Sequence, residues 1–215
     1  MEEPQSELEA SYDRVAENFA EEFCGELERK PFDRVLLDDF AESLRGEGRV
    51  CEIGCGPGQI ARYLRDRGVE MCGIDLSREM VRFARRLSPD IPFEHGDMLK
   101  LDAPDASLAG IICFYAIIHL RREDAPRALA QMHRALRPGG RLLVSFHGGE
   151  GELHRDEWYG KQVSIDVTLF KEDEMSGYME AAGFEVERVV GREPYEFEYP
   201  TRRLYAFARK PSRAT

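Results

Sequence analysis

His119 is the side chain in this sequence best suited to move a proton near neutral pH. It follows the apolar run 108–115, which has the pattern of a buried strand. An imidazole titrates close to physiological pH, so it can accept a proton from a reacting hydroxyl or ammonium group. Its alternative role is to hydrogen-bond the backbone of its own loop. We predict that His119 is a general base at the carboxyl end of that strand.

A glycine-rich turn provides a second kind of chemistry. Gly54, Gly56 and Gly58 lie between a short apolar run and the start of a helical pattern. Glycines at such a turn permit positive φ angles and let a ligand approach the backbone. Asp75 follows Gly56 by 19 residues, at the end of the next predicted strand, where an acidic side chain meets ribose hydroxyls. The spacing predicts a nucleoside-binding site. The alternative is a turn that only packs the helix on the sheet.

Two residues in this turn disfavour a dinucleotide. Gln59 stands where the dinucleotide fingerprint has glycine or alanine, and Pro57 lacks the N–H that would face a pyrophosphate. The sequence also contains no Gly-x-x-x-x-Gly-Lys-Ser/Thr motif, which excludes a P-loop.

A second group of histidines and aromatic residues follows the predicted fifth strand. We expect these side chains, together with Phe19 near the N-terminus, to line a substrate pocket. With His119 they could also suggest a metal site, but the sequence has no HxH or HExxH spacing, so no metal is expected. The predicted pocket residues are Phe19, His147, His154, Trp158 and Tyr159.

Alternating strand and helix patterns must position these residues. Apolar runs predict strands over 49–53, 71–74, 91–94, 108–115, 141–146, 184–190 and 204–209. Helical periodicity covers 11–28, 31–44, 59–67, 78–87, 123–136 and 171–182, whereas 148–161 resembles a long polar loop and 163–170 an extended segment. This alternation predicts an α/β fold with a Rossmann-like, doubly wound, mostly parallel seven-stranded sheet, helices on both faces and an N-terminal helical lid.

We predict that residues 1–215 form a single domain. Its parts are an N-terminal helical lid or cap over 1–46, a cofactor-binding core over 47–147, and a substrate-side loop with the C-terminal strands over 148–215. Arg202 and Arg203 precede the last strand and could meet an acidic substrate, but a solvated pair is the expected arrangement.

In combination, the motifs resemble those of the class I S-adenosylmethionine-dependent methyltransferases that act on small molecules (methyltransferase type 11/25-like). The resemblance covers roughly residues 11–147. It rests on Glu52-x-Gly54-x-Gly56-x-Gly58, Asp75-Leu76-Ser77 with Met80, Gly96-Asp97-Met98, and Leu136-Arg137-Pro138-Gly139-Gly140-Arg141-Leu142. Tyr12-Asp13-x-x-Ala16 is also similar to the lid helix of that family.

The resemblance implies a role for each matched residue. The three glycines would line the methionine part of S-adenosylmethionine, Glu52 would help to hold its amino group, and Asp75 would bind the ribose. Leu76 and Met80 would pack on adenine. Asp97 would accept a hydrogen bond from the exocyclic amine, beside the backbone of Met98. The predicted cofactor-binding residues are Tyr12, Glu52, Gly54, Gly56, Gly58, Asp75, Leu76, Met80, Asp97, Met98, Phe114 and Tyr115.

Composition narrows the possible partners. The formal net charge is -11, and ten acidic residues against one basic residue in positions 1–28 account for most of it. No apolar run reaches the roughly 20 residues of a membrane span, and the N-terminus lacks signal-peptide features, so we expect a cytoplasmic protein that does not bind membranes. The absence of an Asn/Asp-Pro-Pro-Tyr/Phe motif after the fourth strand, together with the acidic charge, argues against a nucleic-acid substrate.

The expected function is therefore S-adenosylmethionine-dependent methyl transfer to a small molecule, with His119 as the catalytic base. The acceptor atom (O, N, S or C) stays open, as does the choice between monomer and homodimer. The alternatives are a catalytically silent cofactor-binding subunit that works through a partner, and a nicotinamide-dependent oxidoreductase on the same fold.

Overall fold

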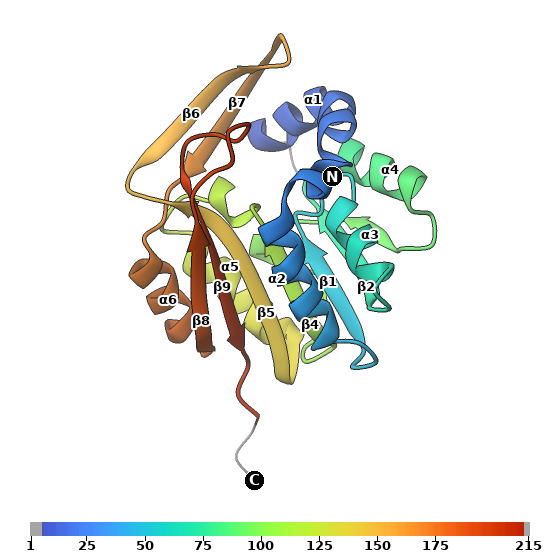
Figure 1. Ribbon diagram of the computed structural model, residues 1–215, viewed down its shortest axis with the longest axis vertical. Coiled ribbons are helices and arrows are strands. Elements are labelled where there is room, and N and C mark those ends of the chain that lie inside the picture. The colour runs from blue at the N-terminus through green and yellow to red at the C-terminus, as the bar shows by residue number, and fades with distance from the viewer. Residues whose placement is uncertain (1–5, 213–215) are drawn as a thin grey trace.

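A seven-stranded sheet forms the centre of the protein, for which the computed structural model describes residues 6–212. The strand order is β3-β2-β1-β4-β5-β9-β8. Neighbours from β3 to β5 pair in parallel, and β9 pairs antiparallel with β5 and β8 (Figure 1). The predicted doubly wound α/β fold is confirmed. The strands are β1 Arg49–Ile53, β2 Glu70–Asp75, β3 Phe93–His95, β4 Leu108–Phe114, β5 Leu136–Gly148, β8 Glu185–Arg192 and β9 Arg202–Arg209.

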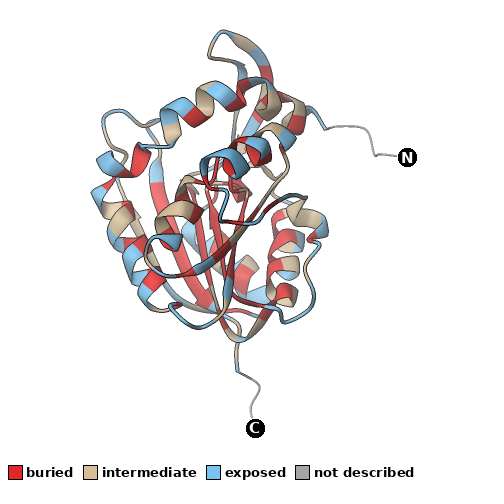
Figure 2. Cartoon of the chain, turned by 90° about the vertical axis from the view of Figure 1, so that its right-hand side faces the viewer, coloured by how far each residue is buried: buried red, intermediate tan, exposed pale blue. Residues whose placement is uncertain are grey.

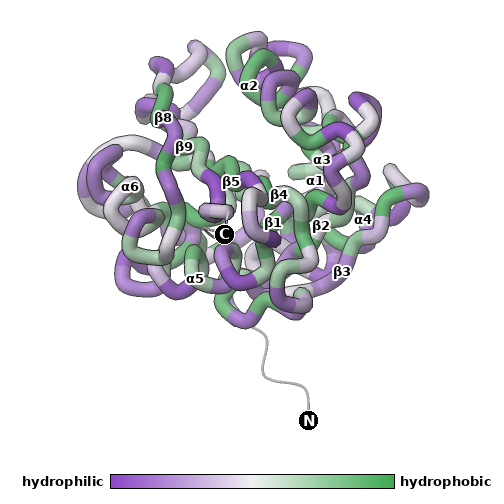
Figure 3. The backbone as a smooth tube through the Cα atoms, turned by 90° about the horizontal axis from the view of Figure 1, so that it is seen from below, coloured by the Kyte–Doolittle hydropathy of each residue, from purple (hydrophilic) through white to green (hydrophobic). Residues whose placement is uncertain are grey.

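Helices cover both faces of this sheet. α2 (Pro31–Glu42), α3 (Gln59–Arg65) and α4 (Arg78–Leu87) bury their apolar side chains on one face, and α5 (Ala125–Ala135) and α6 (Glu172–Ala181) do so on the other. Buried residues follow the strands and the inward sides of the helices (Figure 2). Hydrophobic and hydrophilic positions alternate along α2 and α3, as amphipathic helices require (Figure 3).

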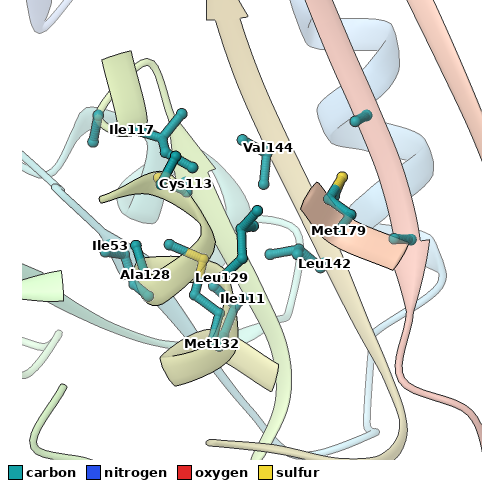
Figure 4. Packing of buried hydrophobic residues seen from close by; sticks show 14 of the residues in the cluster. Ile53, Ile111, Cys113, Ile117, Ala128, Leu129, Met132, Leu142, Val144 and Met179 are labelled. Atoms are coloured by element: carbon teal, nitrogen blue, oxygen red, sulfur yellow. The ribbon is translucent and has the colours of Figure 1, made fainter. Parts of the chain in front are cut away.

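The central strand of the sheet, β4, is apolar throughout. All seven residues of β4 are buried, because helices cover this strand from both sides. On the face shown in Figure 4, Ile111 and Cys113 of β4 contact Leu129 and Met132 of α5 within one cluster, which also contains Met179 of α6. This packing holds β4 rigidly, and therefore also the residues that follow it.

The N-terminal helix begins and ends earlier in the chain than predicted. α1 spans Glu7–Phe23, with Ser6 as its N-cap, and a separate 3₁₀ turn, η1, covers Glu26–Arg29. The predicted helix over 11–28 therefore breaks at Cys24 and Gly25, and the glycine lowers helix propensity at this point. Two further 3₁₀ turns, η2 (Met98–Lys100) and η3 (Ile117–His119), follow β3 and β4.

The predicted polar loop over 148–161 is wrong. Half of it is the strand β6 (Glu152–Trp158), which pairs antiparallel with β7 (Lys161–Thr168) to form a separate hairpin. Tyr159 and Gly160 both have positive φ, which is typical of the two-residue turn of a hairpin. β6 is mostly polar and exposed, so its sequence lacks the apolar pattern of a buried strand.

α1 and the hairpin cover the carboxyl ends of the parallel strands (Figure 1). Val15 of α1 packs with Val163 and Ile165 of β7, and the buried Ser11 hydroxyl accepts a hydrogen bond from the Ser164 amide at 2.8 Å. On its other side α1 reaches α4, where Asp13 accepts hydrogen bonds from the Ser77 hydroxyl and the Glu79 amide.

The division into 1–46, 47–147 and 148–215 stays a prediction, and its residues 1–5 and 213–215 lie outside the described part. Within residues 6–212, no helix has the length and apolar character needed to cross a membrane.

Candidate cofactor and acceptor site

A cavity of about 460 Å³ lies at the carboxyl ends of the central strands. The strand order reverses between β1 and β4, and ligands of open α/β sheets bind in the crevice at such a switch point. α1, the β6–β7 hairpin and the β8–β9 connection (193–201) also contribute to its walls. The volume is typical of a small-molecule site.

Most of the predicted site residues line this one cavity. Two do not. Gly58 faces the Phe93 ring, which a Cβ would meet at 2.8 Å, so its missing side chain lets α3 pack on the sheet. Tyr159 stacks on Trp158, with ring centroids 5.1 Å apart, and hydrogen-bonds Glu22. The lining residues among those predicted are Tyr12, Phe19, Glu52, Gly54, Gly56, Asp75, Leu76, Met80, Asp97, Met98, Phe114, Tyr115, His119, His147, His154 and Trp158.

The glycine loop is a closely packed backbone structure. Gly54 has φ +70°, and a Cβ placed there would lie 2.2 Å from the Ala116 Cβ. Its amide and that of Cys55 both donate to the Ile74 carbonyl, which ties the loop to the end of β2. The loop therefore presents backbone, rather than side chains, to the cavity.

Asp75 is held by the same loop. One carboxylate oxygen accepts from the Gly56 amide at 2.7 Å and the other from the Ser77 amide at 2.8 Å. Burial raises the pKa of Asp75 to about 6, against the lowering effect of these two hydrogen bonds. The side chain is thus mostly ionised at neutral pH, and each oxygen retains a lone pair that can accept from a hydroxyl.

Glu52 is buried at the end of β1 and caps the following helix. Its Oε2 accepts from the Ala61 amide at 2.8 Å, in the first turn of α3, whose N-cap Gly58 has no side chain to do this. Burial raises the pKa of Glu52 well above its usual value. This capping role was not predicted, although a glycine N-cap leaves the helix amides without a side-chain acceptor.

Gln59 carries a buried polar atom without a partner. Its Nε2 donates to Glu26 at 3.0 Å, but its Oε1 has no hydrogen-bond partner and both residues line the cavity. An unsatisfied buried acceptor costs about 1–3 kcal/mol. A ligand with a donor group, such as an ammonium, would satisfy it.

His119 lies in η3, and its two ring nitrogens have different partners. Nδ1 is 3.0 Å from the Asp166 carbonyl oxygen, and Nε2 is 2.7 Å from the Tyr12 hydroxyl. Because a carbonyl only accepts, Nδ1 carries the proton and Nε2 has the free lone pair. Burial lowers the pKa of His119 below its usual value. His119 is therefore a neutral base whose reactive nitrogen accepts a hydrogen bond from the lid helix.

Four aromatic rings form a wall beside His119. Tyr12, Phe19 and Phe23 of α1 contact Trp158 of β6 edge to face, with centroid distances of 6.2, 5.5 and 6.4 Å. Phe19 and Phe23 also stack on each other at 4.2 Å. The wall brings together the lid helix and the hairpin and provides apolar contact area for a ligand.

His147 lies at the end of β5 and also contacts the cavity. Its Nδ1 is 2.5 Å from the Thr201 hydroxyl and 3.2 Å from an Arg203 guanidinium nitrogen. Arg203 is only 4% exposed, so the predicted solvated pair is wrong for this residue, whereas Arg202 is exposed. Arg203 is buried because Thr201, the Tyr199 carbonyl and Glu198 surround its guanidinium.

A buried ion network supports this part of the cavity and was missed by sequence reasoning. Lys30 pairs with Glu26 at 2.5 Å and with Glu198 at 3.2 Å. Arg192 joins Glu198 at 2.5 Å to the fully buried Asp33 at 2.9 Å. These residues come from η1, α2, the Lys30 position between them, β8 and the β8–β9 connection, so no local pattern could have revealed their pairing.

A metal centre finds no support in the geometry. Across residues 6–212, no three histidine, cysteine, aspartate or glutamate side chains are grouped so that they could hold a metal ion. His154 instead pairs with Asp166 at 2.7 Å on the exposed hairpin.

Comparisons with known proteins show which family the segment around the glycine loop is similar to. Residues 50–140 match the family described as a methyltransferase domain. Over 142 residues the chain is 34% identical to a malonyl-acyl-carrier protein O-methyltransferase of Serratia marcescens, covering 63% of this chain and 55% of that protein. It is 33% identical over 158 residues to the 27-O-demethylrifamycin SV methyltransferase of Amycolatopsis mediterranei, covering 67% of this chain and 56% of that protein.

The chain thus spans a little over half the length of these curated relatives. A solved S-adenosylmethionine-dependent methyltransferase of Methanosarcina mazei superposes with a TM-score of 0.70 at 18% identity, over 76% of this chain and 92% of that one, which shows a shared fold. The family match contains the glycine loop, Asp75 and His119, whereas α1, the hairpin and the β8–β9 connection lie outside it.

Proposed function

The chain belongs to the class I S-adenosylmethionine-dependent methyltransferases, and from this premise we propose that it transfers a methyl group to a small-molecule acceptor. The observation that carries the proposal is that the glycine loop, Asp75 and His119 line one cavity. S-adenosylmethionine, when bound, supplies a methyl group already activated by the sulfonium charge. The protein must then bind and orient the acceptor, which can contribute roughly 7–11 kcal/mol, and remove its proton.

The residues on the strand-end side of the cavity fit this cofactor. Asp75 has free lone pairs for the ribose hydroxyls, and Leu76 and Met80 provide apolar contacts for adenine. The unpartnered Gln59 Oε1 would accept from the ammonium of the methionine part, close to the glycine loop. Pro57 has no N–H, but this costs little here, because the cofactor has no phosphate that would need a hydrogen-bond donor at this position.

His119 would act as the general base toward a hydroxyl acceptor. Its Nε2 is unprotonated and lines the cavity, but it is occupied by the Tyr12 hydroxyl at 2.7 Å. An acceptor hydroxyl must therefore replace that of Tyr12, either by displacing the side chain or by a shift of α1. Proton transfer to a positioned base typically contributes 10²–10⁴-fold in rate.

Calorimetry on the purified protein tests the cofactor assignment. We expect S-adenosylmethionine and S-adenosylhomocysteine to bind and NADH not to bind. Asp75→Ala should abolish binding of both adenosyl ligands, whereas the matched variant Asp102→Ala, at an exposed residue outside the cavity, should bind like the wild type. Tight binding of NADH with no response to the adenosyl ligands would reject the proposed function.

A transfer assay separates an enzyme from a silent subunit. The protein is incubated with S-adenosylmethionine carrying a labelled methyl group and a panel of hydroxylated, amino and thiol metabolites. Label in any small product supports the proposal. Cofactor binding without transfer to any member of the panel would point instead to a cofactor-binding subunit that needs a partner.

A further inference from the structure

We propose that the methyl acceptor carries a second oxygen beside its reactive hydroxyl, and that His147 recognises this second oxygen by donating a hydrogen bond from Nε2. This inference rests on the proposed function and specifies its substrate class: planar hydroxylated rings with a neighbouring hydroxyl or carbonyl oxygen. His147 would select and orient the acceptor, whereas His119 would take its proton.

The partners of His147 determine which of its ring nitrogens carries the proton. The positively charged Arg203 guanidinium lies 3.2 Å from Nδ1, so an N–H at Nδ1 would point toward a cation, and electrostatics favours the Nδ1 lone pair on this side. The Thr201 hydroxyl accepts from Arg203 at 2.5 Å and is free to donate its own proton to Nδ1, also at 2.5 Å. The single proton of the neutral ring is therefore on Nε2.

Arg203 is held firmly in this role. It is 4% exposed, donates to the Thr201 and Tyr199 carbonyls, and lies 3.8 Å from the Glu198 carboxylate. Glu198 is itself fixed by Lys30 and Arg192. The ion network that supports the β8–β9 connection thus keeps a positive charge beside Nδ1.

This charge also keeps His147 neutral. Burial, and then the charge of Arg203, lower the pKa of His147 to about 3. His147 therefore cannot serve as a base near neutral pH. What it offers the cavity is a permanent hydrogen-bond donor.

The two histidines are complementary and line the same cavity. His119 follows β4, and His147 lies two residues beyond Ser145, which pairs with Phe114 at the end of β4. Adjacent strands lie about 4.8 Å apart, so the two rings stand at neighbouring strand ends. His119 offers an acceptor nitrogen and His147 a donor. Such a pair matches a hydroxyl and an adjacent oxygen on the same molecule.

The aromatic wall indicates the shape of the rest of the acceptor. Tyr12, Phe19, Phe23 and Trp158 all line the cavity. Their rings favour a flat apolar partner, against which edge-to-face and offset contacts form.

Histidine NMR tests the proton positions directly. The protein is labelled with ¹⁵N-histidine and saturated with S-adenosylhomocysteine, and long-range ¹H–¹⁵N spectra report which nitrogen of each ring is protonated. We expect Nε2–H for His147 and Nδ1–H for His119 across pH 6–8. A protonated Nδ1 on His147, or a doubly protonated ring at pH 7, would overturn the proposal.

Binding of two matched probes tests the recognition. Catechol has two adjacent oxygens and phenol has one, and each is titrated into the protein saturated with S-adenosylhomocysteine. We expect catechol to bind at least about tenfold more tightly, as one buried hydrogen bond allows. His147→Met should remove this difference, whereas His147→Gln, whose amide can place a donor near the Nε2 position, should retain part of it.

The failure of this inference and of the proposed function can be told apart. If S-adenosylhomocysteine does not bind, the proposed function fails before any probe is added. If S-adenosylhomocysteine binds but catechol and phenol bind equally or not at all, only the inference is overturned. A preference for catechol that survives His147→Met overturns it as well, because another residue would then recognise the second oxygen.

Discussion

The two sides of the cavity are built in different ways. The cofactor side consists of loops that directly follow β1, β2 and β4, and its contacts are mainly to backbone amides, such as those of Gly56 and Ser77 to Asp75. The acceptor side brings together α1, the hairpin and the β8–β9 connection, and its contacts join side chains more than 100 residues apart, such as Tyr12 and His119.

This difference has a functional consequence. Backbone contacts at the strand ends are positioned mainly by the sheet itself. Proteins that share this sheet can therefore keep the same cofactor site while the segments that cover it differ. The family match over residues 50–140 includes the cofactor side and leaves out α1, the hairpin and the β8–β9 connection. We therefore expect specificity for the acceptor to depend mainly on the segments that lie outside the family match.

The largest effect is expected from a change on the cofactor side. Gly54→Ala would place a Cβ 2.2 Å from that of Ala116 at a φ of +70°. We expect loss of S-adenosylhomocysteine binding and a fall in unfolding free energy of more than about 2 kcal/mol, from overpacking combined with backbone strain. Calorimetry and urea unfolding measure the two effects.

Gly46→Ala is the matched control for this variant. It has a similar φ of +79° but nothing within 4 Å of the added Cβ. Only the backbone strain of about 1–2 kcal/mol should appear, with normal ligand binding. Equal effects of the two substitutions would show that the close approach to Ala116 is unimportant.

The next largest effect is expected for the proposed base, His119, which lies between the cofactor side and the acceptor side of the cavity. His119→Ala should lower kcat by about 10²–10⁴ with a hydroxyl acceptor, while S-adenosylhomocysteine affinity stays unchanged. His133→Ala, on α5 outside the cavity, should leave the rate within about twofold. If His119→Ala retained the wild-type kcat, His119 would have a structural role and would not be the base.

The pH profile of the wild type sharpens the same test. A base works only when it is neutral, and burial lowers the pKa of His119 below 6.5. Activity should therefore persist to a lower pH than for an ordinary histidine, and fall as the pH drops through the lowered pKa. If the acidic limb of the pH–rate profile is centred above pH 6.5 and disappears in His119→Ala, this would contradict the lowering of the His119 pKa by burial.

The smallest effect is expected at the contact between the lid and the hairpin. Ser11→Ala removes the acceptor of the Ser164 amide and leaves that N–H unsatisfied. We expect a loss of about 1–3 kcal/mol in unfolding free energy and faster hydrogen exchange in α1 and β7, with little change in cofactor affinity. Ser176→Ala, at a partly exposed position of α6, should change neither quantity. If Ser11→Ala weakened cofactor binding, the cofactor side and the acceptor side of the cavity would not be independent of each other.

Sequence reasoning succeeded where the information is local. The apolar run of β4 and the serine before α4 predicted a buried strand and a helix cap, and both are confirmed, with Ser77 accepting from the Met80 amide. The turn residues Tyr159 and Gly160 could have revealed the hairpin, but the polar residues of β6 concealed it. β6 is a strand because β7 pairs with it, and β7 is in turn held by α1.

The sequence by itself determined the doubly wound sheet and the order of the loops at its edge, because hydrophobic periodicity and glycine positions are read within a few residues. Only the tertiary structure decided which groups surround the ring nitrogens of each histidine and why Arg203 is buried. Those properties depend on Asp166, Thr201 and Glu198, which reach the cavity from other segments of the chain. Local sequence patterns encode secondary structure and turns, whereas the electrostatics of a side chain depend on neighbours that only folding brings together.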